Sequence, residues 1–503
     1  MTLPRLSSSH PAAAGQSGKW PVKAIQIGEG NFIRAFVDWM IHRSNAQGLF
    51  EGSVLVTQPR PGGARKLEVM KEQDGLFTLV ERGISGGETV DRTELISSVS
   101  QCVDPYAEWD TFLATAEDPQ IEFIFSNTTE AGVVYTEEVY DVSQPILSYP
   151  GKLTAWLYRR FQSLGPDSGM VIVPCELLPR PGDALLRVVL QKAQAWQLGA
   201  EFERYIQQAN RFVNSLVDRI VTGYPPEPEA NLLQEQLGYE DRMLVTAEPY
   251  YQWVIEGDTE LARRLPFAEA GLQVEWVSDL QPYSVRKVRI LNGAHTFLVP
   301  MAYLLGHDIV RDAIADERIA SPLRQFLSET VSAILPFSKD ESAAYIQQTL
   351  ERFSNPFIDH KLLDIALNSI QKFQTRLQPT MREYAAAQGI VPQPMIASLA
   401  AFIRFHRCVS DGVHWQGYRI KDGRKEAYEL KDNADALAAF AGLWTVYEQT
   451  QDITVLVAGV MESEAIWTSP PGLELPAELK DGCYSQLASA LSALLSQEEE
   501  ETQ

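Results

Sequence analysis

The chain has 503 residues, of which 45% are hydrophobic and 22% charged, as in a folded globular protein rather than a disordered one. One hydrophobic core rarely serves so long a chain, so we expect two domains. Lys and Arg number 43 against 66 Asp and Glu, which gives a formal net charge of -23. That charge argues against nucleic acid or an anionic membrane as a partner. A small anionic ligand would therefore need a local cluster of positive groups.

The four cysteines lie far apart and show no C-x-x-C spacing, so they indicate neither a zinc site nor a disulfide framework. The cysteine spacing therefore gives no sign of a metal site, and we expect a reducing, cytoplasmic compartment. Residues 1–20 lack the apolar segment of a secretory signal and are predicted to be a flexible leader. No uncharged apolar run is long enough to span a membrane.

An apolar strand over residues 22–27 opens the regular structure and runs into a glycine turn and a helical pattern. A second strand over 53–57 follows at the spacing of one βαβ unit. Residues 76–81 and 89–96 flank several glycines and predict a hairpin. The alternation of helix and strand then resumes, with helices over 105–116 and 153–164 and strands over 121–126 and 171–174. Strands that are apolar on both faces indicate a mostly parallel sheet covered by helices.

The pattern changes at about residue 282, where clear strand signals stop and helical periodicity dominates. The predicted helices of this part span 284–305, 321–334, 360–375 and 394–405. We therefore predict an α/β protein, with a Rossmann-type dinucleotide-binding domain over 21–281 followed by a mainly α-helical domain over 282–503. The second domain is expected to hold the catalytic and substrate-binding residues.

The turn after the first strand has the sequence G-x-G-x-x-I, with Gly28, Gly30 and Ile33 at the three motif positions. A dinucleotide site needs glycines where the backbone turns tightly and approaches a pyrophosphate. The usual third glycine is replaced by Ile33, so the motif alone also fits an ordinary strand-to-helix turn. Its place near the N-terminus, between an apolar strand and a helix of a βαβ unit, favours dinucleotide binding.

The second strand ends in Thr57-Gln58-Pro59-Arg60 rather than in the acidic residue that would bind a ribose 2′-hydroxyl. Because Arg60 is also suited to a 2′-phosphate, the residues alone leave NAD and NADP both open.

Lys287, Asn292 and His295 lie on a segment predicted to be helical. At about 100° per residue all three side chains fall on one side of an α-helix. Carbonyl reduction needs a proton donor and a group that stabilises the developing alkoxide, and a buried lysine and an asparagine N–H can supply these. Each residue taken singly has an ordinary structural explanation, but together they favour chemistry.

Several motifs resemble the polyol-specific long-chain dehydrogenases, which include mannitol dehydrogenase, over most of the chain from about Ala24 to Phe405. They are G-x-G-x-F-x-R at Gly28, Gly30, Phe32 and Arg34, V-D-R-I over 217–220, K-x-x-x-x-N-x-x-H at Lys287, Asn292 and His295, and R-F-x-N-P over 352–356. Within this family the segments 26–32, 125–132, 174–177 and 221–225 look most like the branch that reduces tagaturonate, a keto sugar acid.

The resemblance implies a Rossmann-type domain followed by a helical domain, NAD as the cofactor and no catalytic zinc. It implies Lys287 as the general acid and base, Asn292 as an oxyanion donor and His295 as a substrate contact. The other implied site residues are Asp218, Lys372 and Glu130 around the substrate, and Gly28, Gly30, Asn31, Phe32 and Arg34 at the cofactor. For Glu130, a solvated loop acid is an equally good interpretation.

The sequence departs from the mannitol enzymes at two positions. Their C-D-N motif, with the asparagine as a second oxyanion donor, is Cys175-Glu176-Leu177 here, and leucine cannot donate a hydrogen bond. Their glutamate three residues before the lysine is Ser284 here. The first change leaves the second oxyanion donor unidentified, and the second leaves the route of the proton unidentified. Both changes fit a substrate other than that of the mannitol enzymes.

The resemblance implies an oxidoreductase that reduces D-tagaturonate reversibly to D-altronate with NADH, with a small keto sugar acid as its partner. The alternatives are a fructuronate reductase, a mannitol-type polyol dehydrogenase, and a nucleotide-binding sensor without catalysis. Arg286 and Arg289 flank the lysine, and they are either carboxylate ligands or solvated helix charges. The sequence leaves open the oligomeric state, the direction of the reaction and the groups that bind the carboxylate.

Overall fold

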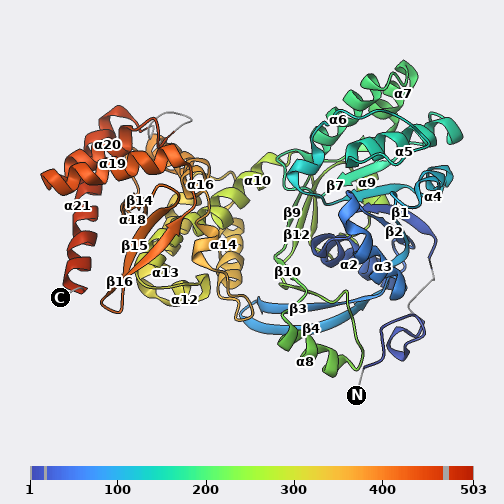
Figure 1. Ribbon diagram of the computed structural model, residues 1–503, viewed down its shortest axis with the longest axis horizontal. Helices are drawn as coiled ribbons and strands as arrows, with labels where there is room; N and C mark the ends of the chain where they lie inside the picture. The colour runs from blue at the N-terminus through green and yellow to red at the C-terminus, as the bar shows by residue number, and fades with distance from the viewer. Residues whose placement is uncertain (1–2, 16–19, 468–474, 502–503) are drawn as a thin grey trace. The chain divides into compact units, whose positions relative to one another are not determined.

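A computed structural model describes residues 3–15, 20–467 and 475–501 (Figure 1). The chain forms two compact units. The first comprises Met1–Gly83 and Thr89–Tyr283, and the second comprises Ile84–Glu88 and Ser284–Gln503. No helix of the described residues is both long and apolar enough to cross a membrane.

The first unit is built on a six-stranded parallel sheet. Its strands in spatial order are β5 (Val99–Val103), β2 (Ser53–Thr57), β1 (Val22–Ile27), β6 (Phe123–Ser126), β7 (Val171–Pro174) and β8 (Arg211–Phe212). Numbered along the chain within this sheet, the order is 3-2-1-4-5-6, that of a Rossmann fold. The strand order reverses between β1 and β6, and ligands of such sheets bind at the carboxyl ends of the strands beside that point.

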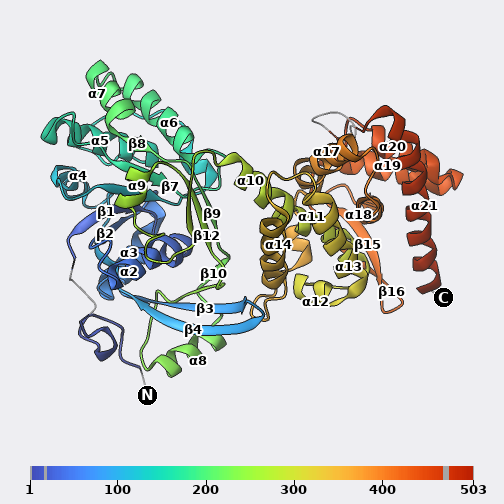
Figure 2. The same ribbon diagram turned by 180° about the vertical axis from the view of Figure 1, so that it is seen from behind.

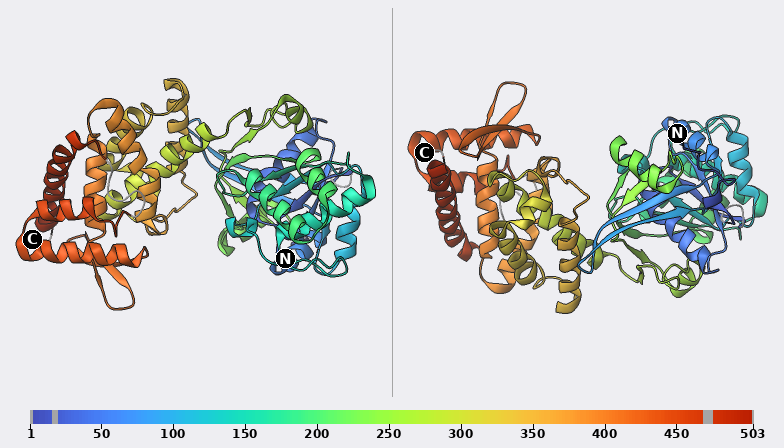
Figure 3. Two further views of the ribbon diagram at one scale, coloured as in Figure 1. Left: turned by 90° about the horizontal axis from the view of Figure 1, so that it is seen from above. Right: turned by 90° about the horizontal axis from the view of Figure 1, so that it is seen from below.

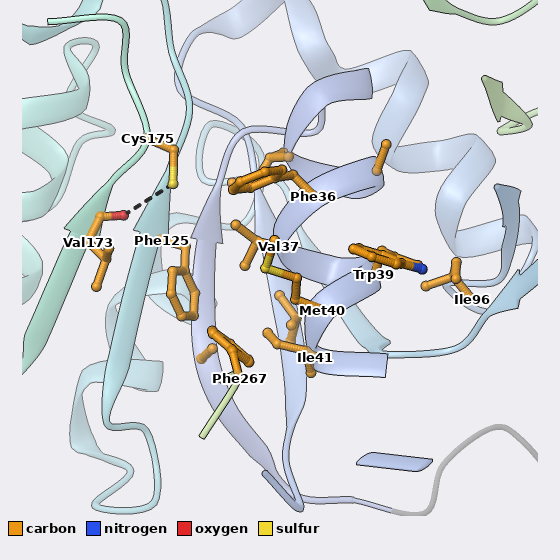
Figure 4. Close-up of a cluster of buried hydrophobic side chains, with 14 of the residues drawn as sticks. Phe36, Val37, Trp39, Met40, Ile41, Ile96, Phe125, Val173, Cys175 and Phe267 are labelled. Atoms are coloured by element: carbon orange, nitrogen blue, oxygen red, sulfur yellow. Dashed lines mark hydrogen bonds between the residues drawn. The ribbon is translucent and has the colours of Figure 1, made fainter. Parts of the chain in front are cut away.

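Helices cover both faces of the sheet (Figures 1 and 2). Alternate residues of one strand enter different cores: Ala24 packs with the helix after the glycine turn, and Ile25 with the helices of the opposite face. The first face carries α1 (Asn31–Ile33), η2 (Arg34–Asp38), α2 (Trp39–Ala46) and α3 (Ala64–Glu72). The other carries α4 (Trp109–Ala114), η4 (Thr115–Glu117), α5 (Tyr149–Leu164), α6 (Pro181–Ala195), α7 (Ala200–Arg204) and η6 (Tyr205–Ala209). Figure 4 shows the first core, where Phe36 and Met40 lie on the side of the helix that faces the strands and Trp39 extends toward Ile96.

Two smaller sheets and short segments complete this unit. The four-stranded sheet has the order β10 (Val221–Gly223), β11 (Val245–Ala247), β3 (Phe77–Ser85) and β4 (Glu88–Ile96). The three-stranded sheet has the order β13 (Val274–Val277), β12 (Gln252–Glu256) and β9 (Ser215–Asp218). The remaining segments are η1 (Pro11–Ala13), η3 (Pro61–Gly63), η5 (Glu130–Val133), α8 (Glu227–Leu237) and α9 (Thr259–Arg264).

The predicted hairpin is confirmed as β3 and β4, which pair around Gly86 and Gly87. Its tip, Ile84–Glu88, belongs to the second unit, where the Gly86 N–H donates a hydrogen bond to Glu351 Oε2 at 3.1 Å. The helix predicted over 105–116 begins later, at Trp109, because the Asp104 carboxylate accepts the Tyr106 N–H and holds residues 104–107 in a turn.

The predicted flexible leader is wrong for residues 3–15, which are packed into the first unit, and residues 1–2 and 16–19 of that leader lie outside the described residues. Leu6 is fully buried beside Leu76 and Tyr239, and its N–H donates to the Glu240 carbonyl at 2.9 Å. Ser8 donates to the Asp74 carboxylate through its N–H and its hydroxyl. Contacts with residues distant in the sequence hold this segment, so no local pattern reveals them.

The second unit is mainly helical, as predicted. Figure 3 shows its last helices, in orange-red and dark red, where α21 packs against α18 and α20. Its helical segments are α10 (Gln281–Lys287), η7 (Val288–Asn292), α11 (Gly293–Leu304), α12 (Val310–Ala315), α13 (Glu317–Gln325), η8 (Phe326–Val331), α14 (Lys339–Phe353), α15 (Leu362–Ile365), α16 (Ser369–Arg376), α17 (Gln378–Gln388), α18 (Gln393–Phe405), α19 (Ala434–Thr450), α20 (Ile453–Glu462) and α21 (Ala477–Glu501).

Two expectations for this unit are wrong. Strands do not stop at residue 282, because an antiparallel sheet of β14 (Cys408–Ser410), β15 (Trp415–Lys421) and β16 (Arg424–Leu430) follows α18. The single helix predicted over 360–375 is divided into α15 and α16, because Asn368 adopts the left-handed conformation with φ of 54°. Asparagine tolerates that conformation better than most residues.

Candidate active site

The glycine turn lies where β1 ends. The Gly28 N–H donates to the Thr57 carbonyl at 2.8 Å, and its φ of +135° is one that residues with a side chain rarely adopt. A Cβ atom there would lie 2.9 Å from the Asn127 carbonyl oxygen, in the loop after β6. Gly28 is therefore required both by its conformation and by the close approach of that loop.

The helix after the turn begins at Asn31, with Gly30 as its N-cap. A Cβ atom on Gly30 would meet nothing within 4 Å, so open space lies beside this backbone. Ile33, which stands in place of the third glycine, is fully buried in the core between helix and sheet. The motif departs from the standard pattern there because a large apolar side chain fills that contact.

Arg34 supports the start of this helix through hydrogen bonds to Asn31 and to the Met243 carbonyl. One of its terminal nitrogens donates to Asn31 Oδ1 at 2.8 Å and the other to the Met243 carbonyl. Its guanidinium lies 5.0 Å from the centre of the Phe77 ring, and Phe32 stacks on Phe36 with ring centres 5.0 Å apart. Burial lowers the pKa of Arg34 to about 10, which leaves it charged at neutral pH. Asn31, Phe32 and Arg34 thus shape the turn and its helix.

Gln58 follows the end of β2 and is a polar residue that is not among the predicted site residues. Gln58 is buried and donates to Asp104 Oδ1 at 2.6 Å, whereas its carbonyl Oε1 is buried without a hydrogen-bond partner within the described chain. Oε1 lies beside Gly63, as does the Glu29 carboxylate. An unpartnered buried acceptor is rare, and this one occupies the position where Rossmann folds bind a ribose. Arg60 follows it on the surface.

The Cys175-Glu176-Leu177 segment follows β7 at the same edge of the sheet. Glu176 is buried and accepts hydrogen bonds from Ser126 Oγ and from the Thr128 N–H, while burial raises the pKa of its carboxyl. Leu177 is 66% exposed. In this first unit Glu130 begins η5 and is exposed, and Asp218 ends β9 and is buried.

In the second unit, Lys287, Asn292 and His295 lie on one continuous helix formed by α10, η7 and α11. The expectation of ideal α-helical geometry is wrong, because η7 is a π segment in which the Gly293 N–H reaches back to the Val288 carbonyl. This wider turn changes the angles computed for an α-helix, and such segments often occur at functional sites. Lys287 and Asn292 stand at its two ends and are half-buried, and His295 is buried in the next turn.

Helix α16 packs against this helix and brings two more cations to it. Arg376 Nη1 lies 3.4 Å from the Asn292 carbonyl oxygen and 3.3 Å from Thr296 Oγ1. Lys372, one turn earlier on α16, donates to the Ile365 carbonyl at 2.8 Å. Lys372 is among the predicted site residues and Arg376 is not, although their spacing places both on one face of a helix.

His295 lies in an apolar and positively charged environment. Its ring centre is 4.2 Å from that of Phe353 and 5.1 Å from that of His360. Burial, and then the nearby His360, Arg352 and Arg376, lower the pKa of His295 well below its usual value. The imidazole is therefore neutral near pH 7 and can exchange hydrogen bonds with a ligand without carrying a charge.

Arg286 and Arg289 are not solvated helix charges, and Arg289 already has an acidic partner. Arg289 donates to Glu383 at 2.8 Å and to Thr380 at 2.7 Å. Arg286 is buried between the rings of Phe337 and Tyr345. Both side chains therefore point into the fold, and neither is placed as a carboxylate ligand.

Sequence profiles match both units in chain order. The profile of the mannitol dehydrogenase Rossmann domain matches residues 22–268, and that of the mannitol dehydrogenase C-terminal domain matches residues 279–466. The chain belongs to the mannitol dehydrogenase family. The resemblance seen in the sequence motifs is thereby confirmed, and so is the expected order of a Rossmann-type domain and a helical domain.

Curated members of the mannitol dehydrogenase family resemble this chain over most of its length. The altronate oxidoreductase of Halalkalibacterium halodurans is 41% identical over 92% of this chain and 90% of its own. Those of Yersinia enterocolitica and Bacillus subtilis are 42% and 39% identical, each over 89% of this chain and over 90% and 89% of their own.

Two solved structures share the family fold at low identity. A D-sorbitol dehydrogenase in substrate-free form has a TM-score of 0.76 at 19% identity, over 99% of this chain and 98% of its own. The Pseudomonas fluorescens mannitol 2-dehydrogenase, solved with NAD and D-mannitol, has a TM-score of 0.64 at 20% identity, over 99% and 97%.

Proposed function

We propose that this protein is an NAD-dependent reductase that interconverts D-tagaturonate and D-altronate. The observation that carries the proposal is the likeness, at 39–42% identity over most of the chain, to relatives named altronate oxidoreductase. The acid–base and polar side chains that such a reaction needs lie together on one helix of the second unit. The four free cysteines fit a reducing cytoplasm as its place of action.

The residues of the first unit fit a dinucleotide. Gly30 leaves open space beside the first turn of the helix, where free N–H groups suit a pyrophosphate. Gln58 offers a buried, unpartnered acceptor where a ribose hydroxyl would bind. Gly28, Asn31, Phe32 and Arg34 form and support that turn.

NADH supplies the hydride that reduces the ketone carbon. In the proposed mechanism Lys287, as its ammonium, donates a proton to the carbonyl oxygen, and in the reverse direction its neutral amine removes that proton. The Asn292 side-chain N–H donates a hydrogen bond to the same oxygen and stabilises its developing charge. Neutral His295 exchanges hydrogen bonds with a substrate hydroxyl, and Lys372 contacts oxygen atoms further along the carbon chain of the substrate. Asp218 and Glu130 remain proposed as residues that support the site.

A substrate panel tests this function. Oxidation of NADH should be fastest with D-tagaturonate, and D-fructuronate and D-fructose should give kcat/KM values lower by at least about tenfold, because recognition of their hydroxyl groups fails. NADPH should replace NADH poorly. A preference for fructuronate or fructose would reassign the substrate, and tight NADH binding without turnover of any of them would favour a sensor.

The two glycines of the turn are expected to respond differently to alanine. Gly28→Ala should lower the free energy of unfolding by about 1–3 kcal/mol, because a Cβ atom meets the Asn127 carbonyl and the backbone conformation becomes strained. Gly30→Ala should leave stability nearly unchanged, because no atom lies within 4 Å, yet weaken NADH binding where the pyrophosphate approaches. Thermal unfolding and NADH titration separate the two effects. Equal NADH affinity in Gly30→Ala and the wild type would place the pyrophosphate elsewhere.

A further inference from the structure

An acidic protein that binds an anionic sugar needs a positively charged side chain that no carboxylate of the protein neutralises. The net charge of -23 repels such a substrate at a distance, so attraction must come from cations inside the site. Several buried arginines do not qualify, because neighbouring carboxylates already neutralise them. In the second unit Arg289 pairs with Glu383, Arg404 with Glu498, and Arg419 with Asp308 and Glu426.

Arg376 differs from these arginines. It is half-buried at the end of α16, and its acceptors are a backbone carbonyl and a hydroxyl at 3.4 and 3.3 Å. Both acceptors are neutral and both distances are long for a hydrogen bond. No ion pair of Arg376 occurs among residues 3–15, 20–467 and 475–501. A planar guanidinium with N–H groups left over is the side chain best suited to grip a carboxylate with two parallel hydrogen bonds.

Lys372 adds a second charge on the same face of α16. Its ammonium donates to the Ile365 carbonyl, and across the described chain it has no ion pair. Asp432, an acid that acts on Lys372 electrostatically, accepts hydrogen bonds from Ser369 Oγ and the Ile370 N–H. Burial, and then the neighbouring Arg376, lower the pKa of Lys372, and the Asp432 carboxylate offsets only part of this effect. Burial also lowers the pKa of Arg376, so both charged side chains are stabilised when an anion binds beside them.

The place of these cations relative to the reacting groups is also suitable. Arg376 contacts the turn from Asn292 to Thr296, which holds His295, and it helps to lower the pKa of that histidine. A substrate whose ketone is held by Asn292 would therefore extend its far end along this helix toward α16.

We propose that Arg376, assisted by Lys372, binds the carboxylate of the substrate and so selects keto sugar acids over neutral keto sugars. The inference rests on the proposed function and names the group that recognises the acid. Arg286 and Arg289, which flank Lys287, are not suited to bind the carboxylate, because each already makes contacts within the fold.

The test compares D-tagaturonate with D-tagatose, which has a CH2OH group in place of the carboxylate. In Arg376→Met, kcat/KM for tagaturonate should fall about 100-fold, mainly through KM, because charge-assisted hydrogen bonds to the carboxylate are lost. For tagatose the change should be below about threefold. Arg376→Lys should keep part of the preference, since the charge remains without the planar fork.

The control is Arg324→Met, which removes an exposed arginine of α13 paired with Glu317 and should change neither substrate. NADH affinity and thermal unfolding report whether each variant is folded. Equal losses for tagaturonate and tagatose in Arg376→Met, with the wild type preferring tagaturonate, would overturn the inference alone. A wild type that prefers tagatose would overturn both the inference and the proposed function. If fructuronate is the better acid, the same comparison is made with fructose.

Discussion

Replacing Lys287 with alanine is expected to lower kcat for tagaturonate reduction at neutral pH by about 10²- to 10⁴-fold, the usual contribution of a positioned general acid. Residues 281–304 contain no other lysine that could take over the proton transfer. The dissociation constant of NADH should change little, because the glycine turn and Gln58 belong to the other unit. Steady-state kinetics with tagaturonate and a fluorescence titration with NADH measure the two quantities.

Altronate oxidation by the same variant gives an independent readout. The missing amine acts as the base in that direction, so hydroxide must replace it, and the rate of the variant should increase in proportion to the hydroxide concentration. Lys339→Ala is the matched control, since it removes an exposed lysine at the start of α14 in the same unit. An enzyme that keeps more than about a tenth of its kcat at pH 7 without Lys287 would refute the assignment.

The sequence predicted those parts of the fold that are local. The strand ending at Ile27, the glycine turn and the buried strand ending at Thr57 are confirmed, because a βαβ unit is encoded in consecutive residues. The two-sided cores also follow from alternation along single strands, as Ala24 and Ile25 show. Ile33 made the sequence motif ambiguous, and the structure shows it as a buried residue of the core between helix and sheet.

The rest of the site depends on contacts between distant segments or on backbone geometry without a clear sequence signal. No pattern marks the π segment between Lys287 and Gly293, and it alters the spacing of side chains that an ideal helix would predict. Arg376 becomes notable only when α16 packs against Asn292 and Thr296 and leaves it without a carboxylate. Conversely, Arg289 is excluded as a ligand of the substrate carboxylate because Glu383, which is distant in the sequence, neutralises its charge. Such pairings are set by tertiary structure.

Arg219, in the motif beside Asp218, joins three parts of the first unit. Its fully buried guanidinium is hydrogen-bonded to Glu81 of β3, to the Ala35 carbonyl in the helix after the glycine turn, and to the Glu248 carbonyl. It also lies over the Trp39 ring at 4.6 Å. Arg219 thus ties the four-stranded sheet to the helix that begins the dinucleotide site. The Glu81 side chain is only 2% exposed and has an outer partner in Arg92, which is 57% exposed.

Arg219→Met is therefore expected to lower the free energy of unfolding by about 3–5 kcal/mol, because it leaves a buried carboxylate whose remaining partner is at the surface. That loss corresponds to a fall in Tm of at least about 6 °C for a unit of this size. Arg92→Met is the matched control and should cost less than about 1 kcal/mol, since its ion pair faces solvent. The double variant Arg219→Met/Glu81→Leu should recover part of the loss by removing the stranded charge. Equal stability of Arg219→Met and Arg92→Met in urea unfolding would contradict this prediction. The ion pair of Arg219 with Glu81 would then not be what holds the helix after the glycine turn in place.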